Sequence, residues 1–408
     1  MHRYRYLILG GGMVAGYAAQ AMVERGLPAD ALAIVSADTA LPYERPPLSK
    51  GFLAGTDDEA SVYINDAAFY RDHGIAVQLD TTVAGVDLGS KQLAISRGER
   101  IGFESLLIAT GAAVRSLDVP GTGEANILYL RSLEDSRRIK AQLPAATRAL
   151  VIGGGFIGME VASVIAQKGI PTTLAFPEQR VWARLFTPEM SAFFQQYYQS
   201  RGVTLAAAER VAAFEHGQDQ QQAAAVTTNG RRIPADLVVA GVGVRPVTGL
   251  FERTGLAMDN GIVVNEYLET SVPGVFAAGD VAQYRDVLYD KQRRVEHWDN
   301  AVEQGKHAAR VLLGERVPFV HVPYFFSDVF DLSYEFWGDT AQADQVVYRG
   351  DVTTSSFSAW WLAGNRLVAA FVMNRPDDER DAAPRWIAER TPVDAVRLKA
   401  DQHALVQT

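Results

Sequence analysis

Two glycine clusters in this chain have the residue types and spacing that hold a pyrophosphate against a protein backbone. The first begins at Gly10 and reads G-x-G-x-x-A, and the second begins at Gly153 and reads G-x-G-x-x-G. Each cluster follows an apolar run and precedes a segment of helical composition. Glycine at these positions permits a tight strand-to-helix turn, close approach of phosphates and close packing of the helix on the strand. The helix N-terminus then offers unpaired N–H groups and partial positive charge.

Each turn therefore predicts a set of dinucleotide-binding residues. The first set is Gly10, Gly12, Met13, Val14 and Ala15. The second set is Gly153, Gly155, Phe156, Ile157 and Gly158.

An acidic residue follows the second strand of each predicted unit, where it could hold a ribose hydroxyl. Asp38 follows the first turn in this way, and Glu178 follows the second. An acid at Glu178 would repel a 2′-phosphate and so favours NADH over NADPH, although Arg180 and Arg184 lie close by in the sequence.

The elements that must position these residues form a strand–helix–strand unit that occurs twice. The first copy is expected at 4–10, 13–25 and 32–36, and the second at 148–153, 156–168 and 170–176. Further strands are expected at 104–111, 236–243, 274–280 and 366–372, and 42–50 should be a loop that leads into a helix. From about 321 the composition changes, and clustered aromatic residues indicate a third, mixed α/β domain.

The predicted fold class is thus α/β, with two Rossmann-like dinucleotide-binding domains and a C-terminal mixed α/β domain. The expected FAD-binding domain is discontinuous, at 1–115 and 245–320, and the expected NAD-binding domain is inserted at 116–244. The C-terminal domain is expected at 321–408. One dinucleotide site would hold a flavin and the other a nicotinamide, so that a hydride passes between two cofactors whose orientation the protein fixes.

Composition excludes several classes of protein. The 408 residues carry a formal net charge of −9, which argues against nucleic acid as the main partner. No cysteine is present, so neither a dithiol nor an iron–sulfur cluster can form within the chain. The seven histidines show no metal-ligand spacing, and we predict no metal site. No apolar stretch approaches the ~18 residues of a membrane span, and we expect a cytoplasmic protein without a membrane partner.

Further motifs resemble the two-dinucleotide flavoproteins of the glutathione-reductase fold. Residues 270–280, TSVPGVFAAGD, are similar to that family's second flavin motif, which implies that Gly279 and Asp280 contact FAD. The turn Ala109-Thr110-Gly111 also matches the family near FAD. The stretch GVGVRP at 241–246 matches the return from the NAD domain, and we assign Gly241 and Gly243 to the NAD site.

Within that superfamily, PYERPPLSK at 42–50 resembles the oxygenase-coupled NADH–ferredoxin reductases. The resemblance implies that Arg45 contacts the FAD pyrophosphate and that Lys50 reaches the flavin and pairs with Glu160. A buried ammonium next to a flavin would stabilise the anionic reduced ring, and it needs a carboxylate partner to stay charged. Lys50 and Glu160 are therefore the predicted catalytic residues, and Val83 and Arg131 complete the FAD set.

The stretch VEHWDNAVEQGKHAA at 295–309 also matches a segment of these reductases. The match implies that Glu296 and His297 contact the nicotinamide. Trp298 falls where some of these reductases place an aromatic ring near the flavin, a position suited to stacking.

The sequence constrains the identity of the electron acceptor less tightly than the cofactors. The absence of cysteine excludes only the related enzymes that depend on a thiol. Residues 323–339 look more like monodehydroascorbate reductase, but Phe326 stands where the plant enzymes carry a tyrosine. The pair Ser327-Asp328 resembles the ferredoxin reductases. We favour a 2Fe–2S ferredoxin that serves an oxygenase or cytochrome P450. A small acceptor such as the monodehydroascorbate radical or a quinone remains open, as does an NADH-sensing interaction protein like apoptosis-inducing factor.

Two further points stay open at this stage. A basic docking surface for an acidic ferredoxin is not assigned, because acidic residues are interleaved with the C-terminal arginines. The oligomeric state, monomer or homodimer, is not fixed by the sequence.

Overall fold

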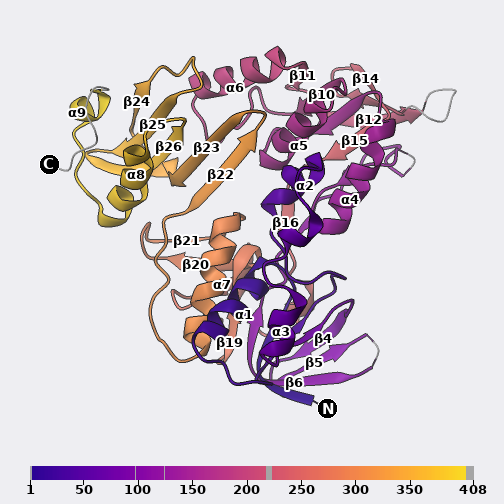
Figure 1. The fold of residues 1–408 in the computed structure, drawn as a ribbon, viewed down its shortest axis with the longest axis vertical. Coiled ribbons are helices and arrows are strands. Elements are labelled where there is room, and N and C mark those ends of the chain that lie inside the picture. Colours follow the sequence, from indigo (N-terminus) through magenta and orange to yellow (C-terminus); the bar gives the residue numbers. More distant parts are fainter. Residues whose placement is uncertain (1, 97, 124, 217–222, 401–408) are drawn as a thin grey trace. The chain divides into compact units, whose positions relative to one another are not determined.

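The computed structural model describes residues 2–96, 98–123, 125–216 and 223–400, and the chain divides into two compact units (Figure 1). The first unit comprises the N-terminal segment to Arg45, residues 59–113 and residues 245–323. The second unit comprises residues 46–58, 114–244 and the chain from Tyr324 onward. Two short strands, β7 (Ala112–Val114) and β16 (Val244–Pro246), lie where the chain passes from one unit to the other.

The first unit is built on a seven-stranded sheet. Its centre is β1 (His2–Leu9), which pairs in parallel with β2 (Leu32–Val35) and β6 (Arg100–Ile108). All four residues of β2 are buried, as expected for a parallel strand covered on both faces. The outer strands are β3 (Ala76–Gln78) and β19 (Val275–Ala277), both parallel, with β4 (Val83–Asp87) and β5 (Gln92–Ile95) antiparallel.

Two helices of the first unit pack against each other through a glycine. They are α1 (Met13–Glu24) and α7 (Trp298–Leu312), which lie side by side in Figure 1. A Cβ atom at Gly305 would lie 2.9 Å from the carbonyl oxygen of Val14, so only glycine fits there. Further elements of this unit include α3 (Ala67–Asp72) and a four-stranded sheet of β17 (Met258–Asp259), β18 (Gly261–Val264), β20 (Ala282–Asp286) and β21 (Lys291–Arg293).

The second unit contains a second Rossmann-type sheet, which is parallel throughout. Its strand order is β11 (Val203–Ala207), β10 (Thr172–Phe176), β9 (Ala149–Ile152), β15 (Leu237–Ala240) and β8 (Leu128–Tyr129). The helix α5 (Phe156–Gln167) connects β9 to β10. The other elements around this sheet are α2 (Gly51–Ala54), α4 (Leu133–Gln142), α6 (Pro188–Ser200) and the antiparallel strands β12 (Val211–His216), β13 (Ala223–Thr227) and β14 (Arg232–Ala235).

The C-terminal part of the second unit is an antiparallel sheet with a helix against it, orange to yellow in Figure 1. The strand order is β22 (Tyr324–Val329), β23 (Leu332–Gly338), β26 (Arg366–Met373), β25 (Phe357–Ala363) and β24 (Gln345–Gly350). The helix α8 (Asp377–Glu389) packs on β26, and α9 (Ala395–Lys399) follows. Aromatic side chains such as Phe336, Trp360 and Phe371 are buried in this sheet, and the mixed α/β character predicted for this region is present within the second unit.

The predicted strand–helix–strand repeat is confirmed with boundaries shifted by a few residues at most. One segment differs in its surroundings: residues 46–58 fall within the expected FAD segment, but they belong to the second unit. The cause is visible in the contacts of this segment, because α2 packs against α4 and Ser136 Oγ donates to the carbonyl of Leu48 at 2.7 Å. Among the described residues, no helix combines the length and the apolar character that crossing a bilayer requires.

Both glycine turns have the same internal contact. Gly10 has φ +120°, and a Cβ atom there would lie 2.1 Å from the carbonyl oxygen of Ala109. Gly153 has φ +119°, and its Cβ atom would lie 2.2 Å from the carbonyl oxygen of Gly241. In each sheet, the first glycine therefore packs directly on the end of the neighbouring parallel strand.

This geometry predicts that Gly158 and Gly155 respond differently to substitution by alanine. A Cβ atom at Gly158 would lie 1.8 Å from the carbonyl oxygen of Gly153, whereas one at Gly155 would meet no atom within 4 Å. Gly158→Ala should lower the stability of the protein by about 1–3 kcal/mol through overpacking. Gly155→Ala, at the helix N-cap, should cost under about 1 kcal/mol. Thermal and urea unfolding of both variants measure the difference, and equal losses would contradict the assigned contact.

Candidate active site

The first glycine turn lies beside Arg45 in the first unit. Gly12 is the N-cap residue of α1, and a Cβ atom there would meet only Arg45 Nη2, at 3.9 Å. The guanidinium of Arg45 lies over the ring of Tyr43, 5.3 Å from its centroid. The open N-terminus of α1 and a cation next to it fit the pyrophosphate of a dinucleotide. The structure thus brings together Gly12 and Arg45, which lie 33 positions apart in the sequence.

Asp38 lies just beyond the carboxyl end of β2, in the first unit. Its carboxylate accepts hydrogen bonds from Tyr43 Oη at 2.9 Å and from the backbone N–H of Ala40 at 3.1 Å. These bonds fix the carboxylate at the end of the sheet where α/β folds bind ribose. Its contact with a ribose remains a prediction.

The turn at 109–111 and the segment at 279–280 lie around the same end of the first sheet. The hydroxyl of Thr110 donates to the carbonyl of Val247 at 2.8 Å, and Gly111 has φ +64°. Gly279 donates its backbone N–H to Gln304 Oε1 at 2.7 Å, and it has φ +77° next to Val14. Asp280 follows in the same short turn. Val83 begins β4 and is buried.

Trp298, the first residue of α7, is held by a carboxylate that the sequence analysis did not single out. Its indole Nε1 donates to Glu44 Oε2, and Tyr17 donates its hydroxyl to Glu44 Oε1. Burial, followed by the bond to Glu44, raises the pKa of Tyr17, so the phenol stays protonated and donates. The only sequence feature that could have identified Glu44 is its place next to Arg45 in the PYERPPLSK segment, which resembles the ferredoxin reductases.

The neighbouring residues Glu296 and His297 differ in their surroundings. Glu296 is exposed and forms an ion pair with Arg294. Burial lowers the pKa of His297 to about 4, against the opposing negative charge of Asp280, so the imidazole is neutral at pH 7. A neutral ring at the N-cap of α7 can donate or accept a hydrogen bond without adding charge to the site.

In the second unit, the second glycine turn has the same open helix start. Gly155 is the N-cap of α5, with free space where a side chain would stand. Phe156 packs edge-on against Phe325, with ring centroids 4.5 Å apart. Ile157 is 39% exposed, an unusual position for a large apolar side chain. Gly241 lies against the turn, and Gly243, two residues further along the chain, has φ +98°.

Lys50 and Glu160 form an ion pair within the second unit. The distance from Lys50 Nζ to Glu160 Oε1 is 2.6 Å, and the side chains are 16% and 5% exposed. Lys50 follows the short 3-10 turn Pro46–Ser49, and Glu160 lies in the second turn of α5. The hydroxyls of Ser49 and Ser327 donate to the same carboxylate. Sequence reasoning missed both hydroxyl contacts.

Glu178 and the two arginines that follow it in the sequence, Arg180 and Arg184, differ in burial and in contacts. Glu178 is half-buried beyond the end of β10. Arg180 donates to the carbonyls of Phe186 at 2.6 Å and Ala183 at 2.9 Å, and to Ser191 Oγ at 2.7 Å. Arg180 thus holds the loop that precedes α6, whereas Arg184 is exposed.

Arg131 also lies in the second unit, between β8 and α4. Its backbone N–H donates to Asp135 Oδ2 at 3.1 Å, next to the capping box that Ser132 and Asp135 form at the start of α4. The fold therefore fixes the backbone of Arg131 through a helix cap.

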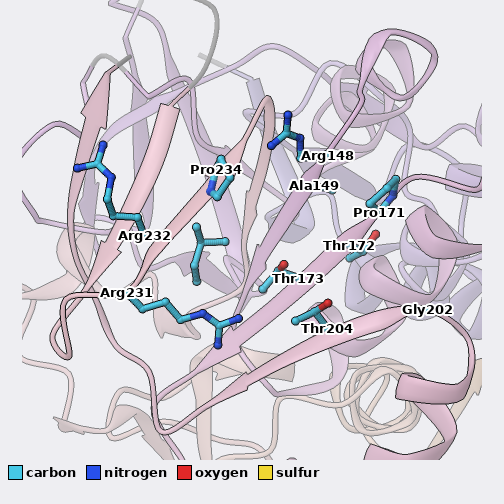
Figure 2. Close-up of a pocket in the computed structure, with 11 residues that line it drawn as sticks. Arg148, Ala149, Pro171, Thr172, Thr173, Gly202, Thr204, Arg231, Arg232 and Pro234 are labelled. Atoms are coloured by element: carbon cyan, nitrogen blue, oxygen red, sulfur yellow. The ribbon is translucent and has the colours of Figure 1, made fainter. Parts of the chain in front are cut away.

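A cavity of about 190 Å³ lies at the opposite edge of the second parallel sheet (Figure 2). Its lining includes the first residues of β9 and β10, whereas dinucleotides bind at the carboxyl ends of such strands. Figure 2 shows Arg231 extending toward Thr173 and Thr204, while Arg232 points away and pairs with Glu215. None of the predicted site residues lines this cavity.

Two Rossmann-type turns in one chain, with an ion pair next to the second, define a class of two-dinucleotide oxidoreductases. The chain belongs to the pyridine nucleotide-disulphide oxidoreductase family, whose model matches residues 4–305. A reductase C-terminal model matches residues 324–408. The family resemblance inferred from the sequence is thereby confirmed, as is the assignment to FAD-dependent NAD(P)H oxidoreductases.

Similar proteins include enzymes with two kinds of acceptor in their names. The chain is 37% identical to peroxisomal monodehydroascorbate reductase 4 of Arabidopsis thaliana over 396 residues, covering 92% of this chain and 80% of that protein. It is 36% identical to putidaredoxin reductase CamA of Pseudomonas putida over 365 residues, covering 88% and 86%. The solved covalent complex of putidaredoxin reductase with putidaredoxin matches with a TM-score of 0.93 at 33% identity, covering 98% of this chain and 96% of that one.

The family implies FAD and a nicotinamide cofactor, and the residues present fit both. Each helix start is preceded by a glycine with open space next to it, so no side chain obstructs a phosphate. The first turn has Arg45 at its side, and the second has Glu178 beyond the adjacent strand. Each set of residues suits a dinucleotide.

The lowered pKa of His297 predicts a pH-dependent loss of stability. The unfolded chain takes up a proton near pH 6.5, but the folded chain does so only near pH 4. The free energy of unfolding is therefore unaffected by this histidine above about pH 6.5, and it decreases as the pH falls from about 6.5 toward 4, because only the unfolded state binds the proton there. Between pH 7.5 and pH 5.5, the wild type should lose about 1 kcal/mol that His297→Gln does not lose. Thermal unfolding of both proteins at the two pH values tests this, and equal losses would refute it.

Proposed function

We propose that this flavoprotein passes a hydride from NADH to FAD and then single electrons to a 2Fe–2S ferredoxin that serves an oxygenase or cytochrome P450. The main support for a ferredoxin as the electron acceptor is the match to the putidaredoxin reductase–putidaredoxin complex over nearly the whole of both chains. The absence of cysteine supports direct transfer from flavin to acceptor, because no protein thiol can relay electrons.

The proposed roles of the residues follow from their places in the two units. Gly10, Gly12, Asp38 and Arg45 hold FAD, together with the turns at 109–111 and 279–280. The turn at 153–158 holds NADH through the N-terminus of α5. Bound FAD supplies the hydride-accepting and one-electron chemistry. The ammonium of Lys50, paired with Glu160, stabilises the negative charge that reduction places on the flavin.

NADH is the proposed donor because of how the cations near Glu178 are used. Arg180 is bound to two carbonyls and a serine hydroxyl, so it is committed to its loop. Glu178 is at the position where a carboxylate binds a ribose hydroxyl and repels a 2′-phosphate. Arg184, six positions after Glu178 in the sequence, is exposed and is the second cation that the sequence analysis weighed in favour of NADPH.

A second candidate, reduction of the monodehydroascorbate radical, is supported by the 37% identity to the Arabidopsis enzyme. Phe326 bears on this alternative, because it lacks the hydroxyl that the sequence comparison associates with the plant substrate site. A site built around a hydrogen bond discriminates strongly against a partner that cannot make it.

The deciding experiment measures NADH-driven reduction of cytochrome c by the FAD-loaded protein, with and without a purified 2Fe–2S ferredoxin. Monodehydroascorbate serves as a parallel acceptor, and NADPH replaces NADH in a matched series. A large ferredoxin-dependent rate supports the proposal. A fast, ferredoxin-independent rate on the small radical would establish the second candidate instead. Slow flavin reduction with a persistent charge-transfer complex would indicate an NADH-sensing protein.

The Lys50–Glu160 pair predicts a specific defect in the first half-reaction. Glu160→Gln keeps the shape of the side chain but removes the charge that compensates the partly buried ammonium of Lys50. We expect the rate of flavin reduction by NADH to fall about 100-fold. Anaerobic stopped-flow absorbance measures this rate. Glu389→Gln, an exposed carboxylate at the end of α8, is the control and should behave as wild type. An unchanged rate in Glu160→Gln would eliminate the assigned role.

A further inference from the structure

The carboxylate of Glu160 accepts hydrogen bonds from three side chains of the second unit. Oε1 accepts from Lys50 Nζ and from Ser327 Oγ, each at 2.6 Å, and Oε2 accepts from Ser49 Oγ. An ionised carboxylate has about four lone-pair sites, so most of its acceptor capacity is used. Only one of the three donors carries a charge. The two hydroxyls therefore orient the carboxylate without neutralising it.

Ser327 comes from a part of the chain that is remote from the other two donors. It is fully buried in β22, the edge strand of the C-terminal sheet, and lies 167 positions from Glu160. Alternate residues of β22, Phe325, Ser327 and Val329, are buried. The hydroxyl of Ser327 thus lies where this sheet meets α5.

The same strand and the turn after it contact α5 and Lys50 at two further points. Three residues beyond Glu160, Ser163 Oγ accepts a hydrogen bond from the backbone N–H of Phe330 at 2.7 Å. Phe326, adjacent to Ser327, places its ring centroid 5.3 Å from Lys50 Nζ. Two consecutive residues of β22 therefore contact the two members of the ion pair.

We propose that Ser327 is a positioning residue for flavin reduction: β22 orients the Lys50–Glu160 pair through the Ser327 hydroxyl on the carboxylate and the Phe326 ring against the ammonium. The inference rests on the proposed function of the pair. It assigns the C-terminal domain a part in the NADH half-reaction, in addition to any contact with the electron acceptor.

The physical reason is the flexibility of the lysine and the burial of its partner. A lysine ammonium moves on a four-carbon stem with many rotamers, and a carboxylate can rotate about its last bond. A buried ion pair is favourable only when its geometry is good and its remaining lone pairs are satisfied. With hydroxyls on both oxygens, the carboxylate has one orientation, and the ammonium bonded to it is fixed as well.

The packing of the C-terminal sheet on α5 does not by itself require the hydrogen bond from Ser327 to Glu160. The bond between Ser163 and Phe330 and the packing of Phe156 on Phe325 already hold the sheet against α5. Ser163→Ala removes a docking bond of the same helix without touching Glu160. It is therefore the matched control for Ser327→Ala.

The test compares wild type, Ser327→Ala, Ser163→Ala and Ser327→Thr by anaerobic stopped-flow over a range of NADH concentrations. We expect Ser327→Ala to lower the limiting rate of flavin reduction about tenfold, the effect of one lost hydrogen bond to a charged group. The apparent Kd for NADH should stay within about twofold of wild type, because uniform binding is unaffected. Ser163→Ala should keep the wild-type rate, and Ser327→Thr, which retains the hydroxyl, should recover most of it.

A structural readout accompanies the kinetics. Crystal structures of wild type and Ser327→Ala should show that the Lys50 Nζ–Glu160 Oε1 separation lengthens, or that the carboxylate rotates, only in the variant. If Ser327→Ala fails to fold, Phe326→Leu tests the other contact and should lower the rate about threefold, since one cation–π contact is lost.

Several outcomes would overturn the inference. They are an unchanged rate and geometry in Ser327→Ala, an equal loss in Ser163→Ala, or an unchanged rate in Phe326→Leu when Ser327→Ala cannot be studied. A wild-type rate in Glu160→Gln would instead remove the proposed role of the pair itself. A slow Glu160→Gln with a fast Ser327→Ala would leave the function intact and refute only the positioning role.

Discussion

The constraint on which both units depend is the contact between a glycine backbone and the end of the neighbouring parallel strand. In each sheet, the position that a Cβ atom would occupy lies about 2 Å from a carbonyl oxygen, at Ala109 for Gly10 and at Gly241 for Gly153. A side chain at either glycine would separate the strands and displace the helix start. The same contact sets the start of the following helix, so the packing that builds the sheet also shapes the proposed phosphate site.

The segment PYERPPLSK divides its side chains between the two units. Glu44 accepts hydrogen bonds from Tyr17 and Trp298 in the first unit, and Ser49 and Lys50 contact Glu160 in the second. Two prolines, Pro46 and Pro47, lie between these anchors and restrict the backbone. Each end of the segment is thus fixed by a carboxylate with several donors. The Glu160 carboxylate is stable in the protein interior because it is both paired with Lys50 and hydrogen-bonded by two hydroxyls.

The features that the sequence could predict are those that depend on the local spacing of residue types. The turns at Gly10 and Gly153 and their flanking strands and helices follow from periodicity and glycine placement, and the change of character after about residue 321 follows from clustered aromatic residues. The Lys50–Glu160 contact required a family resemblance, because no local pattern relates residues 110 positions apart. Glu44 and Ser327 were missed as partners, since a carboxylate or hydroxyl in a loop or strand has the same local signature whether solvated or buried. Residues 46–58 were grouped with the first unit by sequence order, whereas their contacts are with α4 and α5.

Related enzymes that differ in their named acceptors are similar to this chain over most of its length, so one family of sequences is compatible with different acceptors. The turn at 153–158 and Glu160 need carry no information about the acceptor. The C-terminal strand β22 is different, because Ser327 faces Glu160 while Asp328, next to it, is exposed. Substitutions that adapt this strand to an acceptor must therefore keep a hydroxyl at one position and an aromatic ring at another. This requirement gives a physical reason why neighbouring residues in β22 would tolerate change to different degrees.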